Sequence, residues 1–253
     1  MKKKVALHNL GCKVNAYEVE AMQQLLENAG YETVPFEEGA DVYVINTCTV
    51  TNIADRKSRQ MLHKAKKMNP DAIVVATGCY AQADTEKLKE DIAVDLILGN
   101  NQKGNIVQVL EEYEQQHTKQ KHVLKINQTK EYEELAIDHT AEHVRAYIKV
   151  QDGCNQFCTY CIIPKIRGNF RSVPMERLIK EATELAEQGV KELILVAQET
   201  TLYGKDIYGE KSLHKLVKEL CKISGIRWIR ILYCYPEEIT DELIQVMKEE
   251  PKV

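Results

Sequence analysis

The sequence lacks any long hydrophobic run, and it lacks a strong charge of one sign. No apolar stretch in its 253 residues has the length that a transmembrane helix or the core of a signal peptide requires. We therefore predict a cytoplasmic protein with no membrane partner. The 34 Lys and Arg residues face 38 Asp and Glu residues, which gives a formal net charge of -4 at pH 7. This near balance neither supports nor excludes a nucleic-acid partner, and any basic binding surface must be local.

Cysteines, in contrast, are well represented, with eight in the chain. In a reducing compartment they rarely pair as disulfides, so cysteines that cluster indicate metal ligation or redox chemistry. The hydrophobic content of 44% and the length of the chain are enough to bury a sizeable core and to form two domains.

The first half of the chain alternates short apolar runs with helical patterns. The first helix has Asn15 as a candidate N-cap, with Glu18 three residues later as in a capping box. Short β-branched runs separated by helices predict an α/β fold, a parallel sheet covered by helices on both faces. The runs predicted as strands are residues 5–10, 42–46, 73–77 and 95–100.

The pattern changes after residue 117. Residues 118–143 are polar without a sustained hydrophobic period, so we predict a linker that contains an extended segment over 122–126. The alternation then resumes, with strands predicted at 146–150, 193–197 and 228–232. Three strand-helix units cannot close an eight-stranded barrel, so residues 144–253 are expected to form an incomplete (βα) barrel behind an N-terminal domain of residues 1–117.

Three cysteines follow predicted strands of the first half. Cys12, Cys48 and Cys79 each stand a few residues beyond such a strand, in NLGC, NTC and TGC. Because the carboxyl ends of parallel strands share one edge of a sheet, where ligand sites lie, we expect the three thiols to converge. One such cysteine alone would be read as a small buried hydrophobic residue, but three in equivalent positions favour a site.

A second group of three cysteines lies within eight residues, in CNQFCTYC. Cys154, Cys158 and Cys161 are separated by gaps of three and two residues, and no fourth cysteine or histidine is close by in the sequence. Structural zinc sites use four ligands, and bacterial ferredoxin runs have two-residue gaps with a further cysteine nearby. A cluster held by three cysteines leaves one iron without a protein ligand, so a substrate or cofactor can bind there.

These motifs resemble those of a known family. The CxxxCxxC pattern, with Tyr160 before its last cysteine, resembles the radical SAM superfamily. NLGCKVN, VINTCTVT and TGCYAQ in the first half, with GCNQFCTYCIIPKIRG in the second, resemble the methylthiotransferase family. The resemblance implies two four-iron, four-sulfur (4Fe-4S) clusters. One would be an auxiliary cluster on Cys12, Cys48 and Cys79, and the other would bind S-adenosyl-L-methionine from Cys154, Cys158 and Cys161.

The resemblance also implies an activity, and it leaves the substrate divided between two branches. HNLGCKVNAYE looks most like the branch that adds a methylthio group to carbon 2 of N6-threonylcarbamoyladenosine next to the tRNA anticodon. ELILVAQETTLYGKDIYGE looks more like the branch that methylthiolates an aspartate of a small-subunit ribosomal protein. We predict tRNA, with the ribosomal protein as the alternative. A reductant such as flavodoxin or ferredoxin is implied in both cases.

Further side chains are candidates for contact with S-adenosyl-L-methionine. By resemblance, Tyr160 would pack on the adenine, or else fill the barrel mouth as a loop aromatic. Gln198 and Glu199 follow the second barrel strand and would contact the methionine amino group, or else form a structural polar cap. Arg167, just after the cysteine loop, would meet a carboxylate or a phosphate, or else belong to a solvated face.

The remaining features have weaker assignments. A basic run in the second helix would contact tRNA phosphates or would be an ordinary solvated face. Cys221 and Cys234 have no partner pattern and are taken as structural. The basic run consists of Arg56, Lys57, Arg59, Lys64, Lys66 and Lys67.

We expect the barrel to be truncated in this chain and the family's small C-terminal substrate-binding β-domain to be absent. A non-catalytic iron-sulfur or zinc-binding module, which needs no S-adenosyl-L-methionine pocket, is the alternative from another class.

Overall fold

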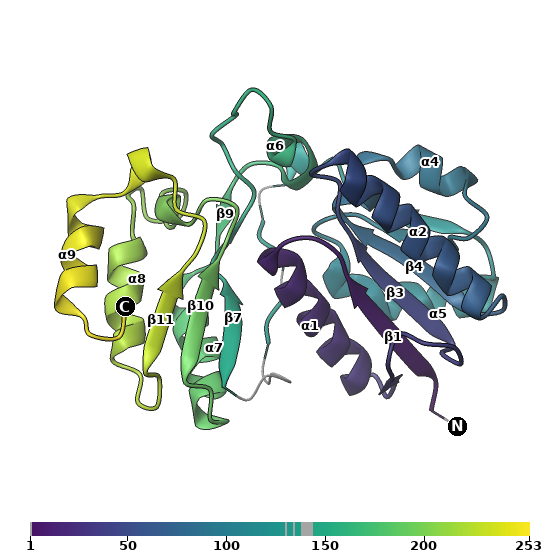
Figure 1. Ribbon diagram of the computed structural model, residues 1–253, viewed down its shortest axis with the longest axis horizontal. Helices are drawn as coiled ribbons and strands as arrows, with labels where there is room; N and C mark the ends of the chain where they lie inside the picture. Colours follow the sequence, from purple (N-terminus) through teal and green to yellow (C-terminus); the bar gives the residue numbers. More distant parts are fainter. Residues whose placement is uncertain (1, 130, 134, 138–143) are drawn as a thin grey trace. The chain divides into compact units, whose positions relative to one another are not determined.

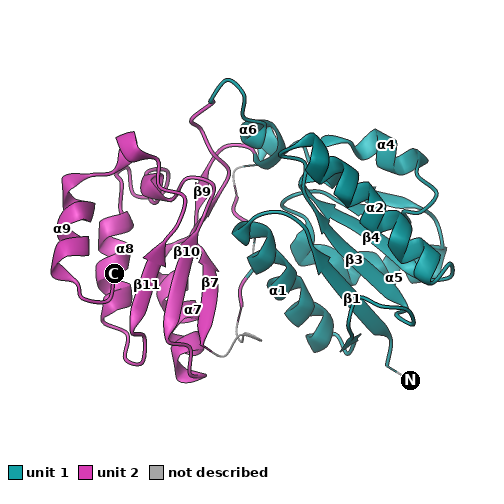
Figure 2. Cartoon of the chain, viewed as in Figure 1, with its two compact units in different colours: residues 1–129, 133–135, 158–167 teal, residues 130–132, 136–157, 168–253 magenta. Residues whose placement is uncertain are grey.

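The computed structural model describes residues 2–129, 131–133, 135–137 and 144–253. These residues form two compact units, which Figure 2 shows in different colours. Unit 1 comprises the described parts of residues 1–129, 133–135 and 158–167, and unit 2 those of 130–132, 136–157 and 168–253. None of the helices in the described part of the chain is long and apolar enough to cross a membrane.

Unit 1 is built on a six-stranded sheet in the order β2-β1-β3-β4-β5-β6, and every pairing in it is parallel (Figure 1). This confirms the predicted parallel α/β fold. The strands are β1 (Lys4–Asn9), β2 (Glu32–Thr33), β3 (Val42–Thr47), β4 (Ile73–Gly78), β5 (Leu96–Leu98) and β6 (Gln120–His122).

Helices cover both faces of this sheet, because alternate strand residues point to opposite sides. On one side Tyr43 and Ile45 pack with Leu62 of α2 and Leu88 of α4. On the other side the alternate residue Val44 packs with residues of α1 and α5. The helices of unit 1 are α1 (Lys13–Asn28), α2 (Asn52–Met68), α3 (Cys79–Ala83), α4 (Thr85–Glu90), the 3-10 turn η1 (Lys103–Asn105) and α5 (Ile106–Gln116).

The start of α1 corrects one expectation. The helix begins at Lys13 with Cys12 at its N-cap, and no side chain caps it. Asn15 and Glu18 are therefore inside the helix, where both are buried. Their spacing resembles a capping box, but their polar groups face the interior of unit 1, and both residues bind Arg167, which is far away in the sequence.

The predicted linker over 118–143 is also corrected in part. Residues up to 129 belong to unit 1, where β6 extends the sheet beside β5 and η2 (Ile126–Gln128) follows. The strand precedes the extended segment predicted at 122–126 and overlaps it only at His122. The short, polar strand has no alternating pattern that would reveal it in the sequence. The rest of the linker lies partly outside the described residues.

Unit 2 contains a three-stranded parallel sheet in the order β11-β10-β7. Its strands match the three predicted from the sequence to within one residue at each end. A two-stranded antiparallel pair joins the ends of the cysteine loop and was not predicted, because two residues are too few to form a pattern. The elements are β7 (Arg145–Lys149), β8 (Gln151–Asp152), β9 (Arg171–Ser172), α7 (Met175–Glu187), β10 (Glu192–Val196), η3 (Thr200–Leu202), α8 (Leu213–Cys221), β11 (Trp228–Ile231), η4 (Pro236–Glu238) and α9 (Asp241–Glu249).

Candidate functional site

Three cysteines of unit 1 lie directly beyond three neighbouring strands. Cys12 follows β1 and is the N-cap residue of α1, Cys48 follows β3, and Cys79 follows β4 as the first residue of α3. The strands β1, β3 and β4 are adjacent and in register, with Asn9 opposite Asn46 and Asn46 opposite Thr77. The geometry therefore brings the three residues to one edge of the sheet.

Tight backbone packing surrounds this edge. Gly11 has a φ of 107°, and a Cβ there would lie 3.0 Å from the Cys48 sulfur. Gly78, with a φ of 88°, lies against Asn46, and an added Cβ would lie 2.2 Å from its Oδ1. Both glycines adopt a conformation that other residues rarely adopt, so the edge has little tolerance for substitution.

The three thiols share one electrostatic environment. Cys48 and Cys79 are 5% and 3% exposed, whereas Cys12 is exposed. Burial is the largest cause that raises the pKa of Cys48 and of Cys79, and charge on Cys12 would raise both pKa values further. The Arg167 guanidinium acts in the opposite direction and lowers the pKa of both thiols. The three thiols therefore influence one another electrostatically.

The donor set decides which group would fit. No three His, Cys, Asp or Glu side chains among the described residues are arranged to hold a single metal ion. Cysteines of an iron-sulfur cluster bind different irons and stand farther apart than the ligands of one ion. Thiolates are also the ligands that such clusters use, and coordination deprotonates even a buried thiol. The residue types are therefore those that an iron-sulfur cluster uses.

A buried polar network lies beside the thiols. Arg167, which is 1% exposed, donates to both carboxylate oxygens of Glu18 at 2.6 and 3.2 Å and to Asn15 Oδ1 at 2.9 Å. Glu18 also lies 3.4 Å from Lys103 Nζ, which donates to Asn100 Oδ1 at 2.8 Å. Sequence reasoning missed Glu18, Lys103 and Asn100 as site residues, since their partners are distant in the chain.

Arg167 was expected to meet a carboxylate or a phosphate. In this structure it binds a carboxylate of the chain itself, that of Glu18. The reason is that α6 (Ile163–Arg167) packs with the first unit, so its last side chain points into the interior of that unit.

The CxxxCxxC cysteines are divided between the two units. Cys154 belongs to unit 2, where its N–H donates to the Gly168 carbonyl at 3.1 Å. Cys158 and Cys161 belong to unit 1 and are joined by a turn, in which Cys161 N–H donates to Cys158 O at 2.9 Å. Tyr160 is 91% exposed, so it fills no part of a core and its ring is free to meet a ligand.

Gln198 and Glu199 lie just beyond β10, after Ala197, and each carries a polar atom that has no partner among the described residues. Gln198 Oε1 accepts from Gly153 N–H at 2.6 Å, while its buried Nε2 has no partner among the described residues. One oxygen of Glu199 accepts from Thr201 N–H at 2.9 Å and so caps η3, while the other is buried without a partner in the same described part of the chain. Such buried polar groups are costly unless water or a ligand pairs with them.

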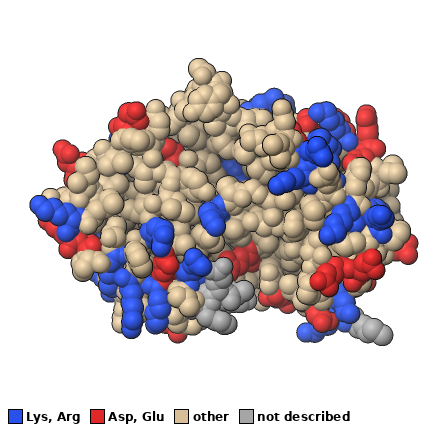
Figure 3. Space-filling model, viewed as in Figure 1, with Lys and Arg blue, Asp and Glu red and all other residues tan. Residues whose placement is uncertain are grey.

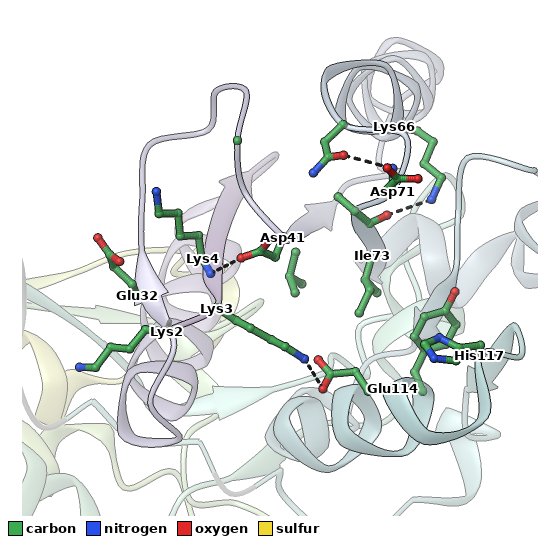
Figure 4. A pocket seen from close by; sticks show the side chains of 15 residues that line it. Lys2, Lys3, Lys4, Glu32, Asp41, Lys66, Asp71, Ile73, Glu114 and His117 are labelled. Atoms are coloured by element: carbon green, nitrogen blue, oxygen red, sulfur yellow. Dashed lines mark hydrogen bonds and ion pairs between the residues drawn. The ribbon is translucent and has the colours of Figure 1, made fainter.

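A separate hollow of about 860 Å³ lies at the amino ends of β1, β3 and β4, opposite the cysteine edge (Figure 4). Charges of both signs line it. Lys3 pairs with Glu114, and Lys4 N–H donates to Asp41 at 2.7 Å. No cysteine lines this hollow, so it has no part in the chemistry of the thiols.

The comparisons with known proteins cover nearly the whole chain. Residues 4–99 match the uncharacterized protein family UPF0004, and residues 148–253 match the radical SAM superfamily. A threonylcarbamoyladenosine tRNA methylthiotransferase of Bacillus subtilis is 42% identical over 98% of this chain and 55% of its own length. A ribosomal protein uS12 methylthiotransferase of Clostridium botulinum is 45% identical over 100% of this chain and 57% of its own length. The chain thus spans little more than half the length of these curated relatives.

Solved structures show the same fold at low sequence identity. TsrM from Kitasatospora setae, a radical S-adenosylmethionine methyltransferase, has a TM-score of 0.63 at 13% identity, over 97% of this chain and 57% of that one. OxsB, a cobalamin-dependent S-adenosylmethionine radical enzyme, has a TM-score of 0.54 at 11% identity, over 98% of this chain and 41% of that one.

The fold and the two groups of cysteines define a radical SAM protein with a second cysteine site. Relatives from both methylthiotransferase branches match the chain from end to end at similar identity. The chain belongs to the radical SAM methylthiotransferase family.

Proposed function

We propose that this protein is a radical SAM methylthiotransferase, which transfers a sulfur-containing group to an unactivated carbon. The observation that carries the proposal is the meeting of three thiols at one sheet edge, in a chain that also has the CxxxCxxC motif. We propose residues 1–117 as the methylthiotransferase domain and 144–253 as the radical SAM domain, with 118–143 as a connecting segment whose first part, up to residue 129, adds β6 to the sheet of unit 1.

Two 4Fe-4S clusters are proposed, each on one group of cysteines. Cys154, Cys158 and Cys161 would hold the cluster that binds S-adenosyl-L-methionine, which supplies on reduction a carbon-centred radical that removes hydrogen from the substrate. Unit 1 would hold the second cluster and keep it largely away from water, because two of its three thiols are buried. The second set of ligands is Cys12, Cys48 and Cys79.

The chain's own polar groups support the S-adenosyl-L-methionine site. Gln198 Nε2 and one oxygen of Glu199, which have no partner in the described part of the chain, can pair with the charged groups of the methionine part. The exposed Tyr160 ring can cover the adenine.

We propose tRNA as the substrate, with carbon 2 of N6-threonylcarbamoyladenosine as the site of modification. The support is the exposed basic face of α2, which begins just after Cys48. Blue side chains lie over the part of unit 1 where Figure 1 places α2 (Figure 3). Arg59 donates to Tyr80 and Lys66 pairs with Asp95, which leaves four exposed cations for phosphates. These are Arg56, Lys57, Lys64 and Lys67.

An aspartate of ribosomal protein uS12 is the second candidate substrate, because relatives named for that reaction are as similar to this chain as those named for tRNA. In both cases we propose a flavodoxin or ferredoxin as reductant and a cytoplasmic location.

The decisive experiment is mass spectrometry of bulk tRNA and of uS12 from cells with and without the gene. Loss of the methylthio group from tRNA alone would support the first proposal. Its loss from uS12 alone would establish the second, and no change in either would refute both.

A further inference from the structure

The helix α6 joins the CxxxCxxC loop to the first unit. It follows Cys158 and Cys161 directly and ends at Arg167, and the segment 158–167 is part of unit 1. A helix of five residues is not stable alone, so contacts must fix its position. Arg167 provides the strongest of these, a two-point bond to Glu18 of α1 at 2.6 and 3.2 Å.

Two asparagines connect this helix to the auxiliary thiols. Asn15 Oδ1 accepts from Arg167 at 2.9 Å and lies 3.6 Å from the Cys12 sulfur, which donates to it. Asn100 Nδ2 donates to the Ile166 carbonyl at 2.8 Å and lies 4.0 Å from the Cys79 sulfur. The last two residues of α6 are therefore one side chain away from two of the three thiols.

Lys103 also belongs to this buried polar network. Lys103, which is fully buried, donates to Asn100 Oδ1 at 2.8 Å and lies 3.4 Å from Glu18. Each buried charge thus has an opposite charge beside it. Removing one charged member would leave an uncompensated buried charge, which is strongly destabilising. The network therefore favours one position of α6 on unit 1.

We propose that Arg167 is a positioning residue that couples the two cysteine sites. Its guanidinium fixes the helix that follows Cys158 and Cys161, and its positive charge stabilises negative charge on the auxiliary ligands. The cofactor chemistry of this inference rests on the proposed function, whereas the placement of the helix does not.

The first test measures the helix in the metal-free chain by hydrogen-deuterium exchange with mass spectrometry. Replacing Arg167 with Gln or with Lys should accelerate exchange in peptides covering 162–168 by at least about tenfold, because neither side chain reproduces the two-point bond. The control Lys165→Gln changes an exposed side chain of the same helix and should leave exchange unchanged. Parent-like exchange in both Arg167 variants would overturn the coupling.

The second test measures charge at the auxiliary site. In a chain with Cys154, Cys158 and Cys161 changed to Ala, anaerobic reconstitution should leave iron on the N-terminal thiols, and a redox titration followed by electron paramagnetic resonance gives its midpoint. Arg167→Gln should move the midpoint to a more negative potential, and Glu18→Gln should move it the other way, because the two side chains carry opposite charges. Arg167→Lys keeps the charge and should stay near the parent.

The directions of the two shifts in midpoint potential distinguish an electrostatic role of Arg167 from a merely structural one. Equal shifts in the two Gln variants, or no shift, would overturn the proposal even if both proteins fold. If the parent holds no iron at these thiols, the proposed function fails, and the exchange experiment still decides whether Arg167 fixes the helix.

Discussion

The hydroxyl of Ser58 forms hydrogen bonds with both the backbone N–H and the backbone carbonyl of Cys48. It accepts from the Cys48 N–H at 3.1 Å and donates to the Cys48 carbonyl at 2.9 Å. Ser58 lies on α2 and is fully buried, so the helix that follows Cys48 also fixes the conformation of that cysteine. A thiol that must meet two others benefits from such a rigid support.

Ser58→Ala should weaken both the fold and the auxiliary site. It leaves a backbone donor and acceptor of Cys48 without their partner, which should cost about 1–3 kcal/mol in the free energy of unfolding. Urea unfolding of the metal-free chain and the iron bound per chain after reconstitution measure the two effects. Ser224→Ala, at an exposed position, is the matched control. Parent values for both quantities would show that the support is dispensable.

The two cysteine groups should hold separate clusters. Anaerobically reconstituted protein should bind about two four-iron clusters, because each group supplies three thiolates. Cys158→Ala should abolish reductive cleavage of S-adenosyl-L-methionine, whereas Cys48→Ala should retain cleavage and lose sulfur insertion. Chromatography of the deoxyadenosine product measures cleavage, and mass spectrometry of the substrate measures sulfur insertion. Tight zinc without iron at the CxxxCxxC loop, or equal loss of cleavage in two folded variants, would contradict this division.

Glu199→Gln should weaken S-adenosyl-L-methionine binding. The orphan oxygen loses its negative charge while the side chain keeps its size, and a hydrogen bond to a charged group contributes about 1.5–3 kcal/mol, roughly a ten- to hundredfold change in Kd. Anaerobic equilibrium dialysis measures it. Thr201→Ala removes a donor to the capping oxygen and should lower stability with little change in Kd. If Thr201→Ala changed Kd and Glu199→Gln did not, Glu199 would have a structural role.

The basic face of α2 should determine the salt dependence of tRNA binding. Changing Arg56, Lys57 and Lys64 to Gln should weaken binding and reduce the slope of log affinity against log salt by about one for each phosphate that is no longer neutralised. Lys180, Lys218 and Lys222 of unit 2 changed to Gln serve as the control with the same change of net charge. An unchanged slope would remove α2 from the interface, and no tRNA binding by the parent would favour the ribosomal protein.

The metal-free chain should lose stability as the pH rises above about 9. Burial raises the pKa of Cys48 and Cys79 and raises that of Cys221 to about 11, from an ordinary value of 9.0. The unfolded chain therefore ionises these thiols first, so their contribution is complete below pH 9 and is lost as the pH approaches the folded values. Urea midpoints at pH 8 and pH 10 should differ, and less so in a Cys221→Ala variant. A larger difference between the two urea midpoints in that variant would contradict the role given to Cys221.

The sequence could predict the sheet and its cysteine edge, because both follow from local patterns. β-branched runs identified β1, β3, β4 and β5, and the rule that parallel strands share a carboxyl edge brought Cys12, Cys48 and Cys79 together. The position of Gln198 and Glu199 just beyond β10 was predicted in the same way, from the strand pattern.

What the sequence could not predict depends on long-range pairing. Asn15 and Glu18 have the spacing of a capping box, and nothing near them indicates that Glu18 has a partner 149 residues later in Arg167. The polar strand β6 and the two-residue strands β8 and β9 are too short for a hydrophobic period to appear. In each case the structure depends on partners elsewhere in the fold.

The division of the CxxxCxxC motif between the units affects how the protein can be dissected. A cut within residues 118–143 would leave Glu18 and Lys103 in a fragment without Arg167, and would leave the segment 158–167 in a fragment without its binding surface. Separate expression of the two pieces should therefore give less soluble products than coexpression, in which the later segment can complete the first unit in trans. Recombination between related genes at this linker would likewise succeed only when both parents have compatible residues at positions 18 and 167.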